Sequence, residues 1–159
     1  MSRVITAATM LAVGIIALAA APAAHAETQV NATGACKSAL PVFDGNIRSR
    51  PLGVRNEGTS NAFISCSVPS EHGTRLALVG LRVHNGNAVA TSLSCTFVNG
   101  RFNFAPQSET QTIELPANTS DWMIFFPGAT APEGGDLANF SCNLKPGTEL
   151  SYIATQPAS

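Results

Sequence analysis

Charged and aromatic residues are scarce in this sequence. Asp, Glu, Lys and Arg make up 12% of the chain, about half of their usual share in soluble proteins. The formal net charge of −1 offers no basic excess for binding nucleic acid or an anionic membrane. The chain has one Trp and one Tyr, Trp122 and Tyr152. Sugar-binding modules need exposed rings of these two types, so their scarcity weakens a carbohydrate-binding function.

The chain also lacks an apolar run long enough to span a membrane. The run Met10–Ala21 is shorter than the roughly 18 residues that a spanning helix needs. It follows Arg3 and precedes the small-x-small sequence Ala24-His25-Ala26, so it predicts a secretory signal peptide over residues 1–26. Cleavage leaves 133 residues (159 minus 26), about one domain. We expect a soluble protein, without a membrane span, in the periplasm or outside the cell.

Catalytic motifs are missing as well. The sequence contains no nucleophile elbow, P-loop, zinc-protease helix or dinucleotide fingerprint. Two histidines follow the signal peptide, His72 and His84, and we expect both to face solvent. His84 alternates with the apolar residues Leu81 and Val83, which puts it on the same side of a strand as Arg82. A hydrolase would need a carboxylate within hydrogen-bond reach of one of these histidines.

The four cysteines, Cys36, Cys66, Cys95 and Cys142, all lie after the predicted signal peptide. An even number in an exported chain predicts two disulfides. No two of them are close together and no histidine is near, which disfavours a metal site. Of the three possible pairings we favour Cys36–Cys66 with Cys95–Cys142, because each joins elements that are near in sequence. The other two pairings stay open at this point.

Period-2 patterns indicate that the chain is built of strands. Three segments, residues 64–68, 93–97 and 140–144, place a cysteine between apolar residues, with small polar residues facing the other way. Such strands share one core only if their cysteines point into it.

Turn signals separate the strands. Asn85-Gly86 and Asn99-Gly100 predict hairpins that join three consecutive strands into a meander. Pro146-Gly147 predicts a type II turn, after which Leu150 and Tyr152 return in the neighbouring strand. Residues 27–34 show no periodicity and are expected to form a loose N-terminal arm. We therefore predict one all-β domain over residues 27–159, an antiparallel β-sandwich of jelly-roll or immunoglobulin-like type with eight or nine short strands.

Three sequence fragments support this interpretation by resemblance. They are Asn-Phe-Ser-Cys-Asn-Leu-Lys-Pro-Gly at 139–147, Ala-Cys-Lys at 35–37 and Asn-Ala-Phe-Ile-Ser-Cys at 61–66. Together they resemble a group of uncharacterised small exported proteins from Gram-negative bacteria. The resemblance implies export and a disulfide-bonded β fold. It carries no site residues, since no activity is assigned to that group.

The segment Asp121–Phe126 is apolar on both sides. Trp122 shares one side with Ile124 and Phe126, and Met123 shares the other with Phe125. The segment is either a central strand covered on both sides or a strand that exposes Met123 and Phe125 as an interaction patch.

Calcium is a further possibility, at Asp44-Gly45-Asn46 or between Glu133 and Asp136, but ordinary turns are the preferred interpretation of both. Arg48 stands where the first loop would need an oxygen ligand. We expect no metal and no cofactor.

These observations favour a non-catalytic exported β-sandwich that binds a macromolecular partner, such as a protein or an envelope component, or that is structural in the cell envelope. The alternative is a small ligand-binding or carbohydrate-binding module with a groove at Trp122 or Tyr152. A small secreted hydrolase comes third.

Overall fold

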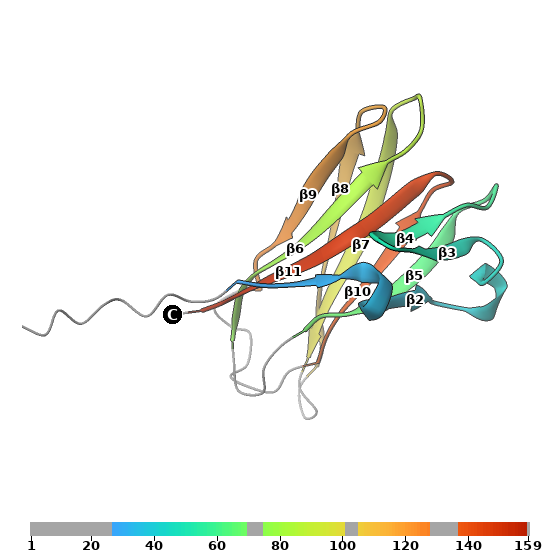
Figure 1. Ribbon diagram of the computed structural model, residues 1–159. Coiled ribbons are helices and arrows are strands. Elements are labelled where there is room, and N and C mark those ends of the chain that lie inside the picture. The colour runs from blue at the N-terminus through green and yellow to red at the C-terminus, as the bar shows by residue number, and fades with distance from the viewer. Residues whose placement is uncertain (1–26, 70–74, 101–104, 128–136, 159) are drawn as a thin grey trace, which may run out of the picture.

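The computed structural model describes residues 27–69, 75–100, 105–127 and 137–158, and most of them belong to two β-sheets (Figure 1). One sheet has six strands in the order β3-β4-β11-β6-β9, with β1 also paired to β11. The other has five strands in the order β2-β5-β10-β7-β8. The strands are β1 Thr28–Asn31, β2 Cys36–Ser38, β3 Ile47–Arg50, β4 Gly53–Asn56, β5 Ala62–Ser67, β6 Leu76–Asn85, β7 Thr91–Gly100, β8 Gln107–Leu115, β9 Ser120–Phe125, β10 Leu137–Leu144 and β11 Thr148–Pro157.

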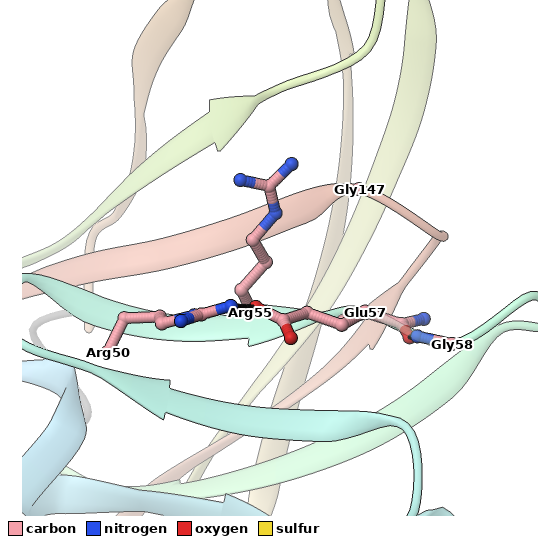
Figure 2. A pocket seen from close by; sticks show the side chains of 6 residues that line it. Arg50, Arg55, Glu57, Gly58 and Gly147 are labelled. Atoms are coloured by element: carbon pink, nitrogen blue, oxygen red, sulfur yellow. Dashed lines mark hydrogen bonds and ion pairs between the residues drawn. The ribbon is translucent and has the colours of Figure 1, made fainter.

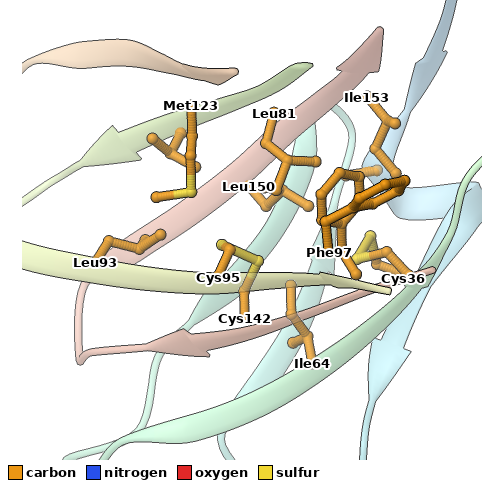
Figure 3. Close-up of a cluster of buried hydrophobic side chains, with 14 of the residues drawn as sticks. Cys36, Ile64, Leu81, Leu93, Cys95, Phe97, Met123, Cys142, Leu150 and Ile153 are labelled. Atoms are coloured by element: carbon orange, nitrogen blue, oxygen red, sulfur yellow. A yellow bond between two sulfur atoms is a disulfide. The ribbon is translucent and has the colours of Figure 1, made fainter. Parts of the chain in front are cut away.

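The two sheets pack face to face and enclose one apolar core. Figure 3 shows side chains of both sheets meeting there, among them Leu81 and Leu150 from the six-stranded sheet and Ile64 and Leu93 from the five-stranded sheet. Every strand pair is antiparallel. The predicted antiparallel β-sandwich is therefore confirmed. The described residues form eleven strands and not eight or nine, because β1 to β4 have only three or four residues each and are too short to show clear alternation.

Three phenylalanines join the sheets at the centre of this core. Phe125 of β9 comes from the six-stranded sheet, and Phe97 of β7 and Phe140 of β10 come from the five-stranded sheet. Their ring centroids lie 5.0 to 5.8 Å apart with tilted planes, within the range that aromatic pairs prefer. All three rings are at most 3% exposed, so each contributes to the apolar stabilisation of the core.

Both disulfides lie within the five-stranded sheet. Cys36 of β2 bonds Cys66 of β5, and Cys95 of β7 bonds Cys142 of β10. Each pair consists of direct cross-strand partners, with Cα atoms 4.0 and 4.1 Å apart. All four cysteines face the core, since each of them is 8% exposed or less. The favoured pairing and the inward direction of the cysteines are confirmed.

The predicted meander is wrong, because the chain changes sheet after Asn85. β6 pairs with β9 and β11, whereas β7 pairs with β8 and β10 in the other sheet. Asn85 is fully buried, and its side chain stabilises this crossing between the sheets through hydrogen bonds. Its amide nitrogen donates to the carbonyl oxygens of Val89, Leu115 and Pro116, and its side-chain oxygen accepts from the backbone nitrogen of Asn87. The second Asn-Gly turn is wrong in position, because Asn99 and Gly100 lie within β7 and Asn99 pairs with Gln107 of β8. The antiparallel pairing of β7 with β8 itself is confirmed.

A second buried asparagine repeats this arrangement between β4 and β5. Asn56 donates to the carbonyl oxygens of Ser60 and Leu144, and its side-chain oxygen accepts from the backbone nitrogen of Gly58. β4 belongs to the six-stranded sheet and β5 to the five-stranded sheet. Each asparagine thus satisfies backbone groups that a crossing between sheets would leave buried and unpaired.

The Pro146-Gly147 turn forms as predicted, but it also joins different sheets. Gly147 has φ of 76°, and the backbone nitrogen of Thr148 donates to the carbonyl oxygen of Lys145, which is the geometry of a type II turn. β10 precedes this turn in the five-stranded sheet and β11 follows it in the six-stranded sheet. The strand after the turn is therefore not the hydrogen-bonded neighbour of the strand before it.

The N-terminal segment after residue 26 is ordered, contrary to the expected loose arm. Thr28–Asn31 forms β1, which pairs with β11, and the short helix α1, Ala32–Ala35, follows it. Ala32 is fully buried against the core. The side chain of Asn31 caps the helix by accepting a hydrogen bond from the backbone nitrogen of Thr33. A short 3-10 helix, η1, spans Pro41–Phe43. The predicted signal peptide lies outside the described residues, and none of the helices described has the length and hydropathy needed to cross a bilayer.

Candidate binding face on the six-stranded sheet

Met123 and Phe125 do not form an interaction patch. Their exposed fractions are 1% and 0%, and Figure 3 shows Met123 pointing into the core. Residues alternate between the two sides of a strand, so Trp122 and Ile124 face outward from β9. β9 is also an edge strand, not the central strand that the sequence suggested as the alternative.

Trp122 belongs to a row of three large side chains on the outer side of the six-stranded sheet. Strand register pairs Trp122 of β9 with Arg82 of β6, and Arg82 with Tyr152 of β11. All three are partly exposed. Trp122 and Tyr152 are two strands apart, which corresponds to roughly 10 Å between their backbones. We call these three residues the platform.

A β-bulge brings Tyr152 to this side. Leu150 pairs with Val83 and Tyr152 pairs with Arg82, so Ser151 is an extra residue with no partner of its own in β6. Leu150 and Ile153 are both fully buried although three positions apart, which strict alternation would not allow. Without the bulge Tyr152 would point inward with Leu150.

The neighbours of Trp122 hold its indole ring against the sheet. A Cβ atom on Gly80 would lie 3.2 Å from ring atom Cε3 of Trp122 and 3.2 Å from Cδ1 of Ile124. The ring therefore covers a glycine of the adjacent strand, where a larger residue would displace it. The guanidinium carbon of Arg82 lies 5.7 Å from the ring centroid, a cation–π distance.

A polar row runs beside the platform. Strand register aligns Ser120 of β9, His84 of β6, Glu149 of β11 and Arg55 of β4. The Oγ atom of Ser120 and Nδ1 of His84 lie 2.9 Å apart and form a hydrogen bond. The outer side therefore combines two aromatic rings with hydroxyl, imidazole, carboxylate and guanidinium groups.

An open polar pocket of about 400 Å³ lies at the Arg55 end of this row. Figure 2 shows Arg55 standing away from the strand, while Arg50 and Glu57 lie along it and form an ion pair. A Cβ atom on Gly86 would lie 2.8 Å from Nη2 of Arg55, so the guanidinium group rests beside the loop after β6. Gly58 and Gly147 complete the pocket with Asn56.

The outer side of the five-stranded sheet has a different character. Short hydroxyl and amide side chains dominate it, and cross-strand partners such as Thr96 and Thr110 bond to each other at 2.8 Å. Its large exposed residue is Phe63, which is 43% exposed and packs against Phe43 at 5.9 Å. This side carries no aromatic row in the described part of the chain, so the platform distinguishes the six-stranded sheet.

The hydrolase hypothesis finds no support at His84. Its hydrogen-bond partner is Ser120, and among the described residues no carboxylate lies within ion-pair distance of its ring. His72 lies outside the described residues. The structure thus shows a serine next to a histidine without the acid that would orient it.

The first candidate calcium site, at Asp44-Gly45-Asn46, forms hydrogen bonds within the protein. The side chain of Asp44 accepts a hydrogen bond from Ser38, and Arg48 donates to the carbonyl oxygen of Asp44. Residues 27–69, 75–100, 105–127 and 137–158 contain no group of three acidic, His or Cys side chains that could hold a metal ion. Glu133 and Asp136 fall outside these ranges.

Comparisons with known proteins found no matching family model and no matching curated protein. Two solved structures are similar in part. TmCBM61 in complex with β-1,4-galactotriose has 10% identity and a TM-score of 0.39, covering 82% of this chain and 83% of its own. A family 11 carbohydrate-binding module from Clostridium thermocellum, in complex with a β-1,3-1,4-mixed-linked tetrasaccharide, has 11% identity and a TM-score of 0.37, covering 82% and 85%.

Proposed function

We propose that this protein is a non-catalytic carbohydrate-binding module that holds a glycan chain across the outer side of the six-stranded sheet. The observation that carries the proposal is the platform, which places the only Trp and the only Tyr of the chain in one row on either side of Arg82. The scarcity of aromatic residues therefore does not weaken this function, because both rings lie on the same surface.

The chemistry of a sugar ring suits this surface. Its C–H faces are apolar and pack on aromatic rings, while its hydroxyl groups exchange hydrogen bonds with charged and polar side chains. The platform supplies the rings, and the polar row supplies Ser120, His84, Glu149 and Arg55 beside them. The site is an open face and not an enclosed cavity of the kind that buries a small ligand. An extended polymer fits an open face better than a small molecule does.

Export is part of the proposal. Two disulfides are typical of proteins in oxidising compartments, where extracellular and envelope polysaccharides are also found. The intact mass of the exported protein should correspond to a chain that begins at Glu27 and lacks four hydrogens. A mass that retains residues 1–26 would contradict this part of the proposal.

The binding test compares aromatic residues on the two sides of the sandwich. Affinity electrophoresis through gels that contain plant or bacterial polysaccharides should show retarded migration of the wild-type protein. Trp122→Ala and Tyr152→Ala should each weaken binding at least tenfold, as removal of an aromatic anchor commonly does. Phe63→Ala is the matched control, because it removes an exposed ring from the opposite sheet. If all three variants migrate like the wild type, the outer side of the six-stranded sheet is not the binding site.

One observation favours a protein partner as a second candidate. Leu40 and Val42 are 56% and 74% exposed in the segment that follows the edge strand β2, where the backbone nitrogen of Ala39 donates to the carbonyl oxygen of Phe63. Exposed apolar side chains that lie together commonly mark protein interaction sites. A specific partner should lose affinity for Leu40→Ser and Val42→Ser while glycan binding stays unchanged. A partner that binds both variants normally would contradict this second candidate.

A further inference from the structure

Arg82 is placed to bind an anion at the centre of the platform. It lies between Trp122 and Tyr152 in the row, and the cation–π contact with the indole ring is the one interaction that its side chain makes with the described residues. No acidic side chain in the described ranges forms an ion pair with it. A guanidinium group has five N–H donors in a planar fork that matches a carboxylate with two parallel hydrogen bonds. These donors are available to a ligand lying on the two rings.

The surrounding charge favours an acidic ligand. Arg55 continues the polar row, and Arg48 is its cross-strand partner on β3. Neither guanidinium group has an acidic partner within 4.0 Å in the part of the chain that the structure describes. Glu149 is the one carboxylate in the platform and the polar row, and it stands opposite Arg55. This concentration of arginine occurs although the whole chain carries a net charge of −1.

We propose that the ligand is a carboxylated glycan, a chain built from uronic acid units, and that Arg82 binds the carboxylate of a unit lying between Trp122 and Tyr152. This inference rests on the proposed function and specifies its substrate class. Tyr152 and the part of the indole ring that Gly80 and Arg82 leave exposed pack against the sugar, and the guanidinium group of Arg82 selects the acid. The fork geometry distinguishes this role from that of a lysine, which would offer a point charge without paired donors.

The test compares a carboxylated oligosaccharide with its neutral ester and with a sulfated oligosaccharide. Isothermal titration calorimetry at low salt should be carried out with oligogalacturonate, with its methyl ester of the same length, and with a sulfated galactan oligosaccharide. We expect the acid to bind at least tenfold more tightly than the ester. Arg82→Gln should weaken binding of the acid by roughly ten- to a hundredfold, the range for a hydrogen bond to a charged group, and leave the ester unaffected. Arg82→Lys should restore only part of the loss.

Lys37→Gln is the control for net charge, because Lys37 is exposed on β2 of the opposite sheet. It should leave the affinity for the acid unchanged. Thermal melts of all three variants establish that each is folded.

The outcomes separate this inference from the proposed function. If the ester binds as tightly as the acid and depends on Trp122 and Tyr152, the glycan site stands and the carboxylate specificity is refuted. If the sulfated chain alone binds, the site selects a different anion and the inference is again wrong. If neither these chains nor any neutral polysaccharide binds, both this inference and the proposed function are wrong.

Discussion

Replacement of Asn85 by Ala should destabilise the fold more than any exposed substitution, because this side chain is the centre of the crossing from β6 to β7. The change removes three donor contacts, to the carbonyl oxygens of Val89, Leu115 and Pro116, and one acceptor for Asn87. Each hydrogen bond is worth about 1 kcal/mol net, and a buried carbonyl left without a partner costs about 1–3 kcal/mol. We expect a total loss of about 3–5 kcal/mol, a large part of the stability of a domain of this size.

Urea denaturation followed by far-UV circular dichroism measures this loss, with both disulfides oxidised throughout. The midpoint should fall while the denaturant dependence stays constant, which shows that stability has changed and not the extent of unfolding. Asn143→Ala is the matched control. Asn143 is partly exposed on β10, and its side-chain oxygen has no hydrogen-bond partner among the described residues. We expect this control to cost less than about 1 kcal/mol. Equal losses for the two variants would refute the role given to Asn85.

Three further predictions follow from the core and the platform. Phe125→Ala should cost about 3–5 kcal/mol in a thermal or urea melt, since it leaves a cavity beside Phe97 and Phe140, and a loss below about 1 kcal/mol would contradict the inward position of this ring. Reduction of both disulfides should lower the free energy of unfolding by about 2–5 kcal/mol for each bond, and an unchanged urea midpoint would show that the bonds contribute little. Gly80→Ala should shift the Trp122 ring and weaken glycan binding with little loss of stability, because the new methyl group would lie 3.2 Å from that ring. Wild-type affinity would contradict the close fit.

The fold class and the disulfides could be predicted from the sequence because both depend on local patterns. Alternation of apolar and small polar residues around Cys66, Cys95 and Cys142 specifies which side of each strand is buried. The choice of sheet for each strand is not local. The Asn85-Gly86 pair predicts a turn, but it does not show that the turn leads into the other sheet. The carbonyl groups that bind the Asn85 side chain at this crossing belong to Leu115 and Pro116, about 30 residues further along the chain.

The platform was harder to predict than the fold for a related reason. Asp121–Phe126 is apolar on both sides, so alternation could not decide whether Trp122 or Met123 faces the core. The outward direction of Arg82 could be predicted from its apolar neighbours, and the structure agrees. Tyr152 could not be placed, because the bulge at Ser151 reverses the alternation without a glycine or proline to signal it. Only the strand register brings the three residues into one row.

The most direct test of glycan binding on this face is the fluorescence of Trp122, the single tryptophan of the chain. Its emission reports on the platform and on no other part of the molecule. Titration with oligogalacturonate should change the wavelength and intensity of emission in a saturable way, with the same half-point as the calorimetric binding curve. Tyr152→Ala should move that half-point to a higher ligand concentration. A glycan that binds by calorimetry while the emission stays constant would contradict the central claim, since it would bind somewhere other than the platform.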